Sequence, residues 1–219
     1  MSESEERSPA PVMPPRGAWL LGLLIGAMCA IELAIWGGGV LLGAVPGVRG
    51  LVLENGAFWP GLLRDWRPNY AVQPWTMFVT YGFLHSGLIH LAVNMLALWS
   101  LGLRAIERVG VGGFALLYGA SLIGGAIAFG LLAADLRPMV GASGALFGLA
   151  GAVLAWERFD RSSGGLSPWP VAQAVALLLA LNLVLWWAMD GLLAWQTHLG
   201  GFATGWLVAV LVDPARRAG

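Results

Sequence analysis

Long apolar segments, separated by shorter polar connections, run through most of the chain. A helix needs roughly 20 apolar residues to cross the hydrocarbon core of a bilayer. The segments that fit a membrane span lie at about residues 18–42, 78–103, 112–133, 143–156, 169–189 and 195–212. This pattern predicts an all-α membrane protein with six transmembrane helices.

The fourth segment is short for a span, because only thirteen residues separate Ser143 from Glu157. We expect this helix to begin inside the membrane rather than at its surface. The backbone that precedes it must then face protein or water, since lipid offers no hydrogen-bond partner to a peptide group.

Composition agrees with a membrane location. The chain is 58% hydrophobic and only 11% charged, whereas a soluble domain carries about 25% charged residues. Its mean hydropathy is +0.75, so we expect the lipid bilayer to surround it. The formal net charge is zero, which leaves no basic surface for nucleic acid. A single cysteine, Cys29, excludes an intrachain disulfide framework.

The regions outside the spans divide the chain into three parts. Residues 1–17 are polar, acidic and rich in proline, which is typical of a disordered tail. Residues 18–213 form the predicted membrane domain, and residues 214–219 form a second short tail. The long connection at about residues 43–74 carries aromatic side chains that suit a membrane–water interface.

The arginines predict the orientation of the chain. If the N-terminus is cytoplasmic, eight arginines fall on the inner side and four on the outer side. The inner set is Arg7, Arg16, Arg104, Arg108, Arg158, Arg161, Arg216 and Arg217, and the outer set is Arg49, Arg64, Arg67 and Arg137. Since positive residues favour the cytoplasmic side, we expect a multi-pass protein of the cell inner membrane with both tails in the cytoplasm.

Three polar residues share one depth in the three spans that run inward. His90 lies 14 residues before Arg104, Ser143 lies 14 before Glu157, and His198 lies 15 before Asp213. At about 1.5 Å per residue, each side chain lies roughly 21–22 Å above the inner boundary. In a core of about 30 Å this level is close to the outer surface. Intramembrane polar residues of this kind are candidates for a functional site.

The residue types at this depth fit serine-nucleophile chemistry. Ser143 begins a helix, where unpaired backbone N–H groups point toward a developing negative charge, and His198 is the candidate base. His90 and Asn94, which share one helix face, could complete an oxyanion hole. Because no Asp or Glu lies at this depth, we expect a Ser–His dyad without an acidic third member.

Close packing is the alternative interpretation of the same stretch. Glycines at Gly144, Gly148 and Gly151, and at Gly201 and Gly205, would let two helices touch whether or not Ser143 reacts.

Other polar residues in the spans are interpreted as structural. We expect His85 to hold the first loop against the second span and Glu32 to be a structural partner or an interfacial group. We expect Asn182 to form a hydrogen bond between packed helices.

Three separated motifs resemble the rhomboid family of intramembrane serine proteases. GASG at 141–144 resembles the sequence around the family's nucleophile. FLHSGLIHLAVNMLALWSLG at 83–102 resembles its second span, with His90 and Asn94. HLGGFATG at 198–205 resembles its sixth span, with His198, Gly201 and Gly205. The resemblance covers about residues 75–212.

The resemblance implies a six-span rhomboid bundle with an active site open to water on the outer side. It implies cleavage of transmembrane protein substrates without a metal or other cofactor. Ser143 would be the nucleophile and His198 the base, while the Ser143 backbone, His90 and Asn94 would bind the oxyanion. Gly141 and Gly144 flank the nucleophile within its motif.

Two positions depart from the family pattern. Many members have Trp-Arg in the first loop, where this chain has PWTMFVT at 74–80 without the arginine. Some members carry a tyrosine that stacks on the catalytic histidine, and here that position is Phe147. Phe147 can still stack but offers no hydroxyl, and neither departure removes a chemical group that the dyad needs.

Three functions remain in competition. The first is an intramembrane serine endopeptidase that uses a Ser–His dyad. The second is a non-catalytic rhomboid-like scaffold that binds transmembrane helices, against which the presence of both Ser143 and His198 argues. The third is a small channel or transporter, which ranks last because the chain lacks paired half-helix repeats and a series of intramembrane carboxylates.

Overall fold

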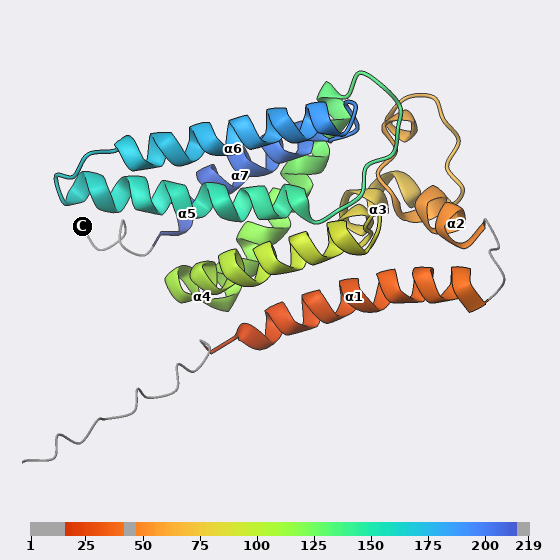
Figure 1. The fold of residues 1–219 in the computed structure, drawn as a ribbon, viewed down its shortest axis with the longest axis horizontal. Helices are drawn as coiled ribbons and strands as arrows, with labels where there is room; N and C mark the ends of the chain where they lie inside the picture. The colour runs from red at the N-terminus through yellow and green to blue at the C-terminus, as the bar shows by residue number, and fades with distance from the viewer. Residues whose placement is uncertain (1–15, 42–46, 214–219) are drawn as a thin grey trace, which may run out of the picture.

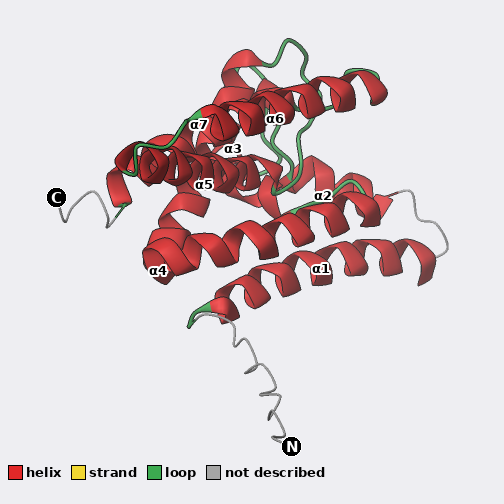
Figure 2. Ribbon diagram, turned by 60° about the vertical axis from the view of Figure 1, so that its left-hand side comes forward, coloured by secondary structure: helices red, strands yellow, loops and turns green. Residues whose placement is uncertain are grey.

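The computed structural model describes residues 16–41 and 47–213, and within them the regular structure is helical. One isolated antiparallel bridge joins Phe58 and Met139. The helices are α1 (Ala18–Leu41), α2 (Gly47–Gly56), η1 (Pro60–Leu63), α3 (Gln73–Thr80), η2 (Tyr81–Phe83), α4 (Leu88–Leu132), α5 (Ser143–Ser163), α6 (Trp169–Ala188) and α7 (Trp195–Val212) (Figures 1 and 2). The predicted tails at residues 1–17 and 214–219 lie outside the described residues, except for Arg16 and Gly17.

The long helix α4 is two helices joined at Gly110. This residue has φ +72° and ψ −179°, which is not helical, and glycine tolerates such a conformation without steric cost. The predicted segments at 78–103 and 112–133 therefore fall on separate helices. The first helix begins later than predicted, at Leu88, because residues 73–83 form α3 and η2 and the backbone turns at Gly87, with φ +138°.

Three helices, α4, α5 and α7, form the centre of the molecule, and the closest packing joins α5 to α7. Glycines allow this approach. A β-carbon at Gly201 would overlap the carbonyl oxygen of Gly144, and one at Gly205 would overlap that of Gly148. The predicted glycine faces thus meet each other, as close helix packing in lipid requires.

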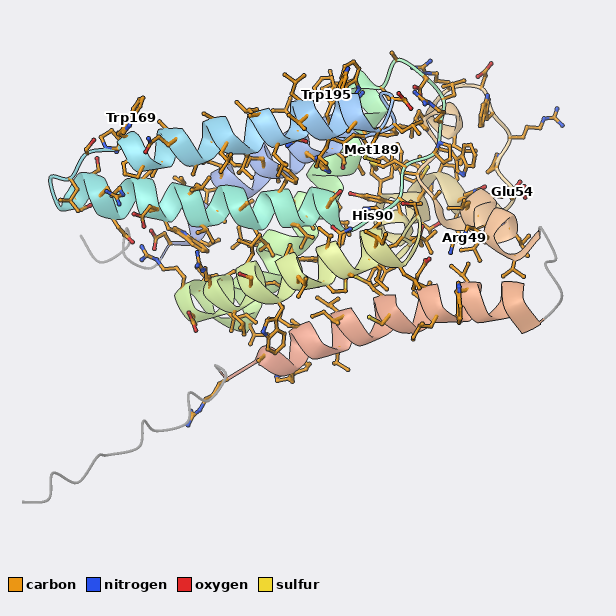
Figure 3. All side chains as sticks on the ribbon, viewed as in Figure 1. Arg49, Glu54, His90, Trp169, Met189 and Trp195 are labelled. Carbon is orange, nitrogen blue, oxygen red and sulfur yellow. The ribbon has the colours of Figure 1, made fainter. Side chains whose placement is uncertain are left out.

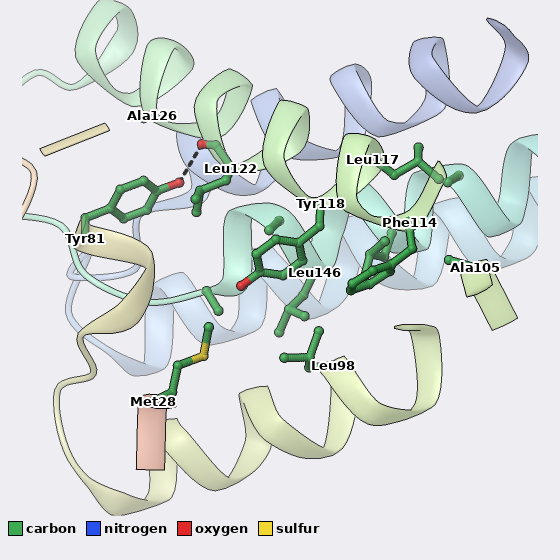
Figure 4. Packing of buried hydrophobic residues seen from close by; sticks show 14 of the residues in the cluster. Met28, Tyr81, Leu98, Ala105, Phe114, Leu117, Tyr118, Leu122, Ala126 and Leu146 are labelled. Carbon is green, nitrogen blue, oxygen red and sulfur yellow. Dashed lines mark hydrogen bonds between the residues drawn. The ribbon is translucent and has the colours of Figure 1, made fainter. Parts of the chain in front are cut away.

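A continuous apolar core fills the space between these central helices. Figure 4 shows part of it, including Leu98, Phe114, Leu117 and Leu146. Tyr81 reaches into this core from η2, and its hydroxyl donates a hydrogen bond of 2.7 Å to the carbonyl oxygen of Leu122. The hydrogen bond satisfies a buried polar group and fixes η2 against α4.

The outer helices α1 and α6 flank the centre on opposite sides (Figure 1). α1 packs along α4. α6 is less enclosed, since Val171 is its one buried residue. Helices that are apolar all round and still exposed in the monomer are typical of lipid-facing spans.

α5 is longer than the predicted fourth segment, because it continues past residue 156 to Ser163. Its added turns are charged, and Arg161 bonds Glu157 at 2.6 Å across one turn. Arg108 of α4 binds Asp160 at 2.8 Å and Asp213 at 3.1 Å, which ties three helices together. The prediction of a short helix is therefore wrong, because α5 has 21 residues. The predicted bounds describe only the apolar part of this helix.

Three described helices are long and apolar enough to cross a membrane: Ala18–Gly38, Leu88–Leu132 and Trp169–Ala188. The second has 45 residues and a break at Gly110. This all-helical structure fits a multi-pass membrane protein.

Residues 47–87, which precede α4, form a compact group at one end of the molecule (Figure 1). Arg49 joins it to α1 through a 2.6 Å ion pair with Glu32, and the same guanidinium donates to the carbonyl oxygen of His85 at 2.9 Å. The Gln73 amide donates to the Glu54 carbonyl at 2.6 Å. These contacts hold the loop firmly beside the beginning of α4.

Candidate active site

Ser143 and His198 meet where α5 and α7 begin. The Ser143 Oγ lies 2.9 Å from His198 Nε2, although the residues are 55 positions apart in the chain. The separation is that of a hydrogen bond. Two features produce it: the glycine contacts let the helices touch, and both side chains occupy the first turn of their helix.

A sharp turn precedes Ser143. Gly141 has φ +123°, a conformation that side-chain-bearing residues rarely adopt, and its N–H donates to the Tyr81 carbonyl at 2.9 Å. Helix α5 then begins at Ser143. The backbone N–H groups of a first helical turn lack carbonyl partners within the helix, so they remain available to an external acceptor.

The His198 ring is packed against a second aromatic ring. Phe147, one helical turn after Ser143, stacks on it with a centroid separation of 4.1 Å and an interplanar angle of 7°. The stacking expected from the sequence is therefore present. It restricts the imidazole to one plane, with His198 itself only 7% exposed.

Asn182 of α6 reaches the other nitrogen of the same imidazole. Its Oδ1 lies 2.6 Å from His198 Nδ1, and its Nδ2 donates to the Leu178 carbonyl at 3.0 Å. The interhelical hydrogen bond that we expected for Asn182 is present, but its partner is the candidate base. A depth count could have found it, since Asn182 lies 13 residues after Trp169, or about 20 Å along the helix.

His90 and Asn94 lie beside Gly141, just before the nucleophile. A β-carbon placed on Gly141 would be 3.0 Å from His90 Nε2 and 3.9 Å from Asn94 Nδ2. Figure 3 labels His90 near the start of α5. The Asn94 amide already donates to the His90 carbonyl at 3.0 Å, which leaves its second N–H able to serve another acceptor.

The tautomer of His90 follows from its other contacts. The backbone N–H of Ser86 lies 3.4 Å from His90 Nδ1, and the Ser86 hydroxyl lies 3.0 Å from the same atom. An N–H donor makes Nδ1 an acceptor, so the ring proton belongs on Nε2. The nitrogen nearest Gly141 is thus a hydrogen-bond donor.

The remaining predicted residues surround this group. His85 is buried, and its ring and the His90 ring form an edge-to-face contact at a centroid distance of 5.2 Å. The His85 carbonyl oxygen accepts a hydrogen bond from Arg49 of α2. Gly144 faces Thr197 of α7. Within the described residues there is no group of three or more His, Cys, Asp or Glu side chains suited to a metal.

This geometry has the elements of nucleophilic catalysis. A hydroxyl contacts an imidazole nitrogen, the imidazole contacts an amide oxygen, and a helix N-terminus with a histidine and an asparagine lies alongside. Nucleophile, base, orienting group and oxyanion donors are recognised by such mutual placement rather than by chain order.

Comparison with known proteins points in the same direction. The family model described as Rhomboid domain matches residues 72–214. The chain is 35% identical over 136 residues to Rhomboid protease GluP of Bacillus subtilis, which covers 62% of this chain and 25% of that protein. It is 38% identical over 132 residues to RHOMBOID-like protein 4 of Arabidopsis thaliana, which covers 59% of this chain and 32% of that protein.

A third relative is Rhomboid-type serine protease 2 of Emericella nidulans, 31% identical over 156 residues, which are 70% of this chain and 29% of that protein. The chain thus spans about a quarter to a third of the length of these relatives. The domain match covers more than half of this chain and includes every residue of the Ser143–His198 site. The chain belongs to the rhomboid family.

Proposed function

We propose that the protein is an intramembrane serine endopeptidase that cleaves transmembrane segments of other membrane proteins. The observation that carries the proposal is the 2.9 Å contact between Ser143 Oγ and His198 Nε2. The names of two relatives, a rhomboid protease and a rhomboid-type serine protease, support the same reaction class.

The reaction begins when the Ser143 hydroxyl attacks the carbonyl carbon of the substrate peptide bond. His198 Nε2 accepts the hydroxyl proton as the new C–O bond forms. The resulting oxyanion accepts hydrogen bonds from the first-turn N–H groups of α5 and from His90 and Asn94. Such preorganised donors stabilise the transition state by several kcal/mol in a water-poor site.

The second half of the reaction returns the enzyme to its starting state. Collapse of the intermediate breaks the C–N bond, and His198 gives its proton to the leaving amine. Water then attacks the acyl ester on Ser143 while His198 accepts a proton from it. The C–O bond to Ser143 breaks, His198 returns the proton to the Ser143 Oγ, and the new carboxyl terminus leaves. The proposal requires a water path to Ser143 from the outer side of the membrane.

The membrane arrangement is part of the proposal. The six spans would be α1, the two parts of α4, α5, α6 and α7. Both chain ends would lie on the cytoplasmic side of a bacterial-type inner membrane. The last turns of α5, which carry Arg158 and Arg161, would then lie inside, and the connection after α4 would lie outside.

Cleavage of a reporter transmembrane substrate by purified protein in detergent and in liposomes tests the function. We expect wild-type protein to cleave, and Ser143→Ala and His198→Ala each to reduce cleavage by at least about a thousandfold. Ser100→Ala is the matched control, because Ser100 is exposed on α4.

Cleavage that survives Ser143→Ala would contradict the proposal. Substrate binding without cleavage by wild-type protein would instead favour the helix-binding scaffold.

A further inference from the structure

Asn182 lies in the middle of α6, where its amide is the polar group that faces His198. We propose that Asn182 is a positioning residue, whose side-chain oxygen holds His198 in the tautomer and ring orientation that Ser143 requires. This inference rests on the proposed peptidase function. It adds a third residue to the expected Ser–His dyad. This residue is a neutral amide that orients the histidine and takes no proton.

The orientation of the Asn182 amide is fixed by two neighbours. Its Nδ2 lies 3.0 Å from the carbonyl oxygen of Leu178, and its Oδ1 lies 2.6 Å from His198 Nδ1. Exchanging the two amide atoms would bring Oδ1 against the Leu178 carbonyl, and two acceptors at that distance repel. The oxygen must therefore face His198.

This orientation determines where the imidazole proton lies. A carboxamide oxygen only accepts, so Nδ1 has to carry the proton and donate it to Oδ1. The lone pair of neutral His198 is then on Nε2, which lies 2.9 Å from the Ser143 hydroxyl. The opposite tautomer would place an N–H against the serine and leave the imidazole unable to act as a base.

Asn182 also restricts rotation of the ring. Phe147 holds the plane of the imidazole through a stacked contact at 4.1 Å, but a stacked ring can still rotate within its plane. The bond from Nδ1 to Asn182 removes that freedom. When His198 accepts the serine proton, Nδ1–H keeps the same bond, so the imidazolium forms without movement of its neighbours.

Asn182 comes from α6, a helix that is weakly enclosed by the rest of the protein. Val171, near the other end of the helix, is its one buried residue, whereas Ser143, Phe147 and His198 belong to the closely packed pair α5 and α7. The position of α6 therefore controls the orientation of the base. Catalytic competence requires α6 to lie in the position seen here.

Kinetic analysis of Asn182→Leu and Asn182→Asp tests the inference. Leucine has similar size but no acceptor, and it does not threaten folding because the neighbours of Asn182 on α6 are apolar. Aspartate in its neutral form keeps both bonds, because one oxygen accepts from His198 Nδ1 and its O–H donates to the Leu178 carbonyl. Gln173→Leu is the matched control, since Gln173 is an exposed polar residue on the same helix.

We expect Asn182→Leu to lower kcat about tenfold or more with little change in KM, as loss of one hydrogen bond in the transition state requires. The rate at which a small fluorophosphonate labels Ser143 should fall by a similar factor, because this reagent needs the base but no transmembrane substrate. Asn182→Asp should recover most of the lost kcat, and Gln173→Leu should match wild-type protein.

Unchanged kcat and labelling in Asn182→Leu would overturn the inference while leaving the peptidase proposal intact. A change confined to KM, or failure of Asn182→Asp to recover any activity, would assign Asn182 to substrate binding or packing and overturn it as well. Absence of both cleavage and Ser143 labelling in wild-type protein would overturn the proposed function and this inference together.

Discussion

At the residue scale, the site depends on a few short contacts, each of which restricts the position or rotation of one side chain. Gly141 sets the turn, Ser143 begins the helix, and His198 receives one contact on each ring nitrogen and one on its face. None of these contacts involves a carboxylate. A neutral arrangement suits this location, because an unpaired charge is costly within a bilayer.

The stacked ring gives a prediction at this scale. Phe147→Ala removes the 4.1 Å contact with His198, and an aromatic contact is worth about 0.5–1.5 kcal/mol. We expect kcat to fall by roughly 2- to 12-fold if that energy is lost in the transition state. Steady-state cleavage assays provide the measurement. Phe147→Tyr keeps the ring and should retain activity, so equal losses in both variants would contradict the stacking role.

The sequence predicted Ser143, His198 and His90 as one group because each could be counted from a charged residue at the inner end of its span, and Asn94 because it shares a helix face with His90. It did not identify Asn182 as a neighbour of the base. The depth of Asn182 can be counted from Trp169, but a largely apolar helix does not reveal which face meets its partners, so the contact with His198 had to come from the structure.

At the element scale, the contact between α5 and α7 determines whether the nucleophile and base meet. Gly201 and Gly205 on α7 face the backbone of Gly144 and Gly148 on α5. The spacing of these glycines predicted the contact from the sequence, since glycines repeated along one face of each helix let the two backbones approach closely.

Gly201→Ala tests the role of this contact. Its new methyl group would overlap the Gly144 carbonyl oxygen, and overpacking of this kind costs about 1–3 kcal/mol. We expect a lower unfolding midpoint in detergent and reduced cleavage, because α5 and α7 must separate. Gly26→Ala on α1 is the control, with no atom within 4 Å of its added methyl. Equal stability of the two variants would contradict the packing account.

Helix boundaries were the least predictable part of the elements. Hydropathy merges α3, η2 and the start of α4 into one apolar run, although the backbone breaks at Gly87. It also ends α5 at Glu157, where ion pairs with Arg161 and between Arg108 and Asp160 extend the helix in water-accessible surroundings. Apolar content marks the membrane-buried part of a helix rather than its ends.

At the scale of the whole molecule, charge and hydropathy together place the chain in the bilayer. The ionic group of Arg108, Asp160 and Asp213 joins α4, α5 and α7 at one end, and the Ser143 site lies toward the other end of α5. In the proposed topology the ionic end is cytoplasmic and the catalytic end faces outward.

Cysteine labelling tests that topology. In a Cys29→Ala background, Ala134→Cys marks the connection after α4 and Ser163→Cys marks the end of α5, both at exposed positions. We expect a membrane-impermeant maleimide to label the first in intact spheroplasts and the second only after permeabilisation. The reverse pattern would contradict the orientation derived from the arginines.

The most direct measurement of the central claim is the site of covalent modification by a fluorophosphonate, found by peptide mapping of the purified protein. The proposed mechanism predicts one adduct, on the peptide that contains Ser143, and its loss in His198→Ala. An adduct on another residue, or cleavage of a transmembrane substrate by protein that never modifies Ser143, would contradict the account.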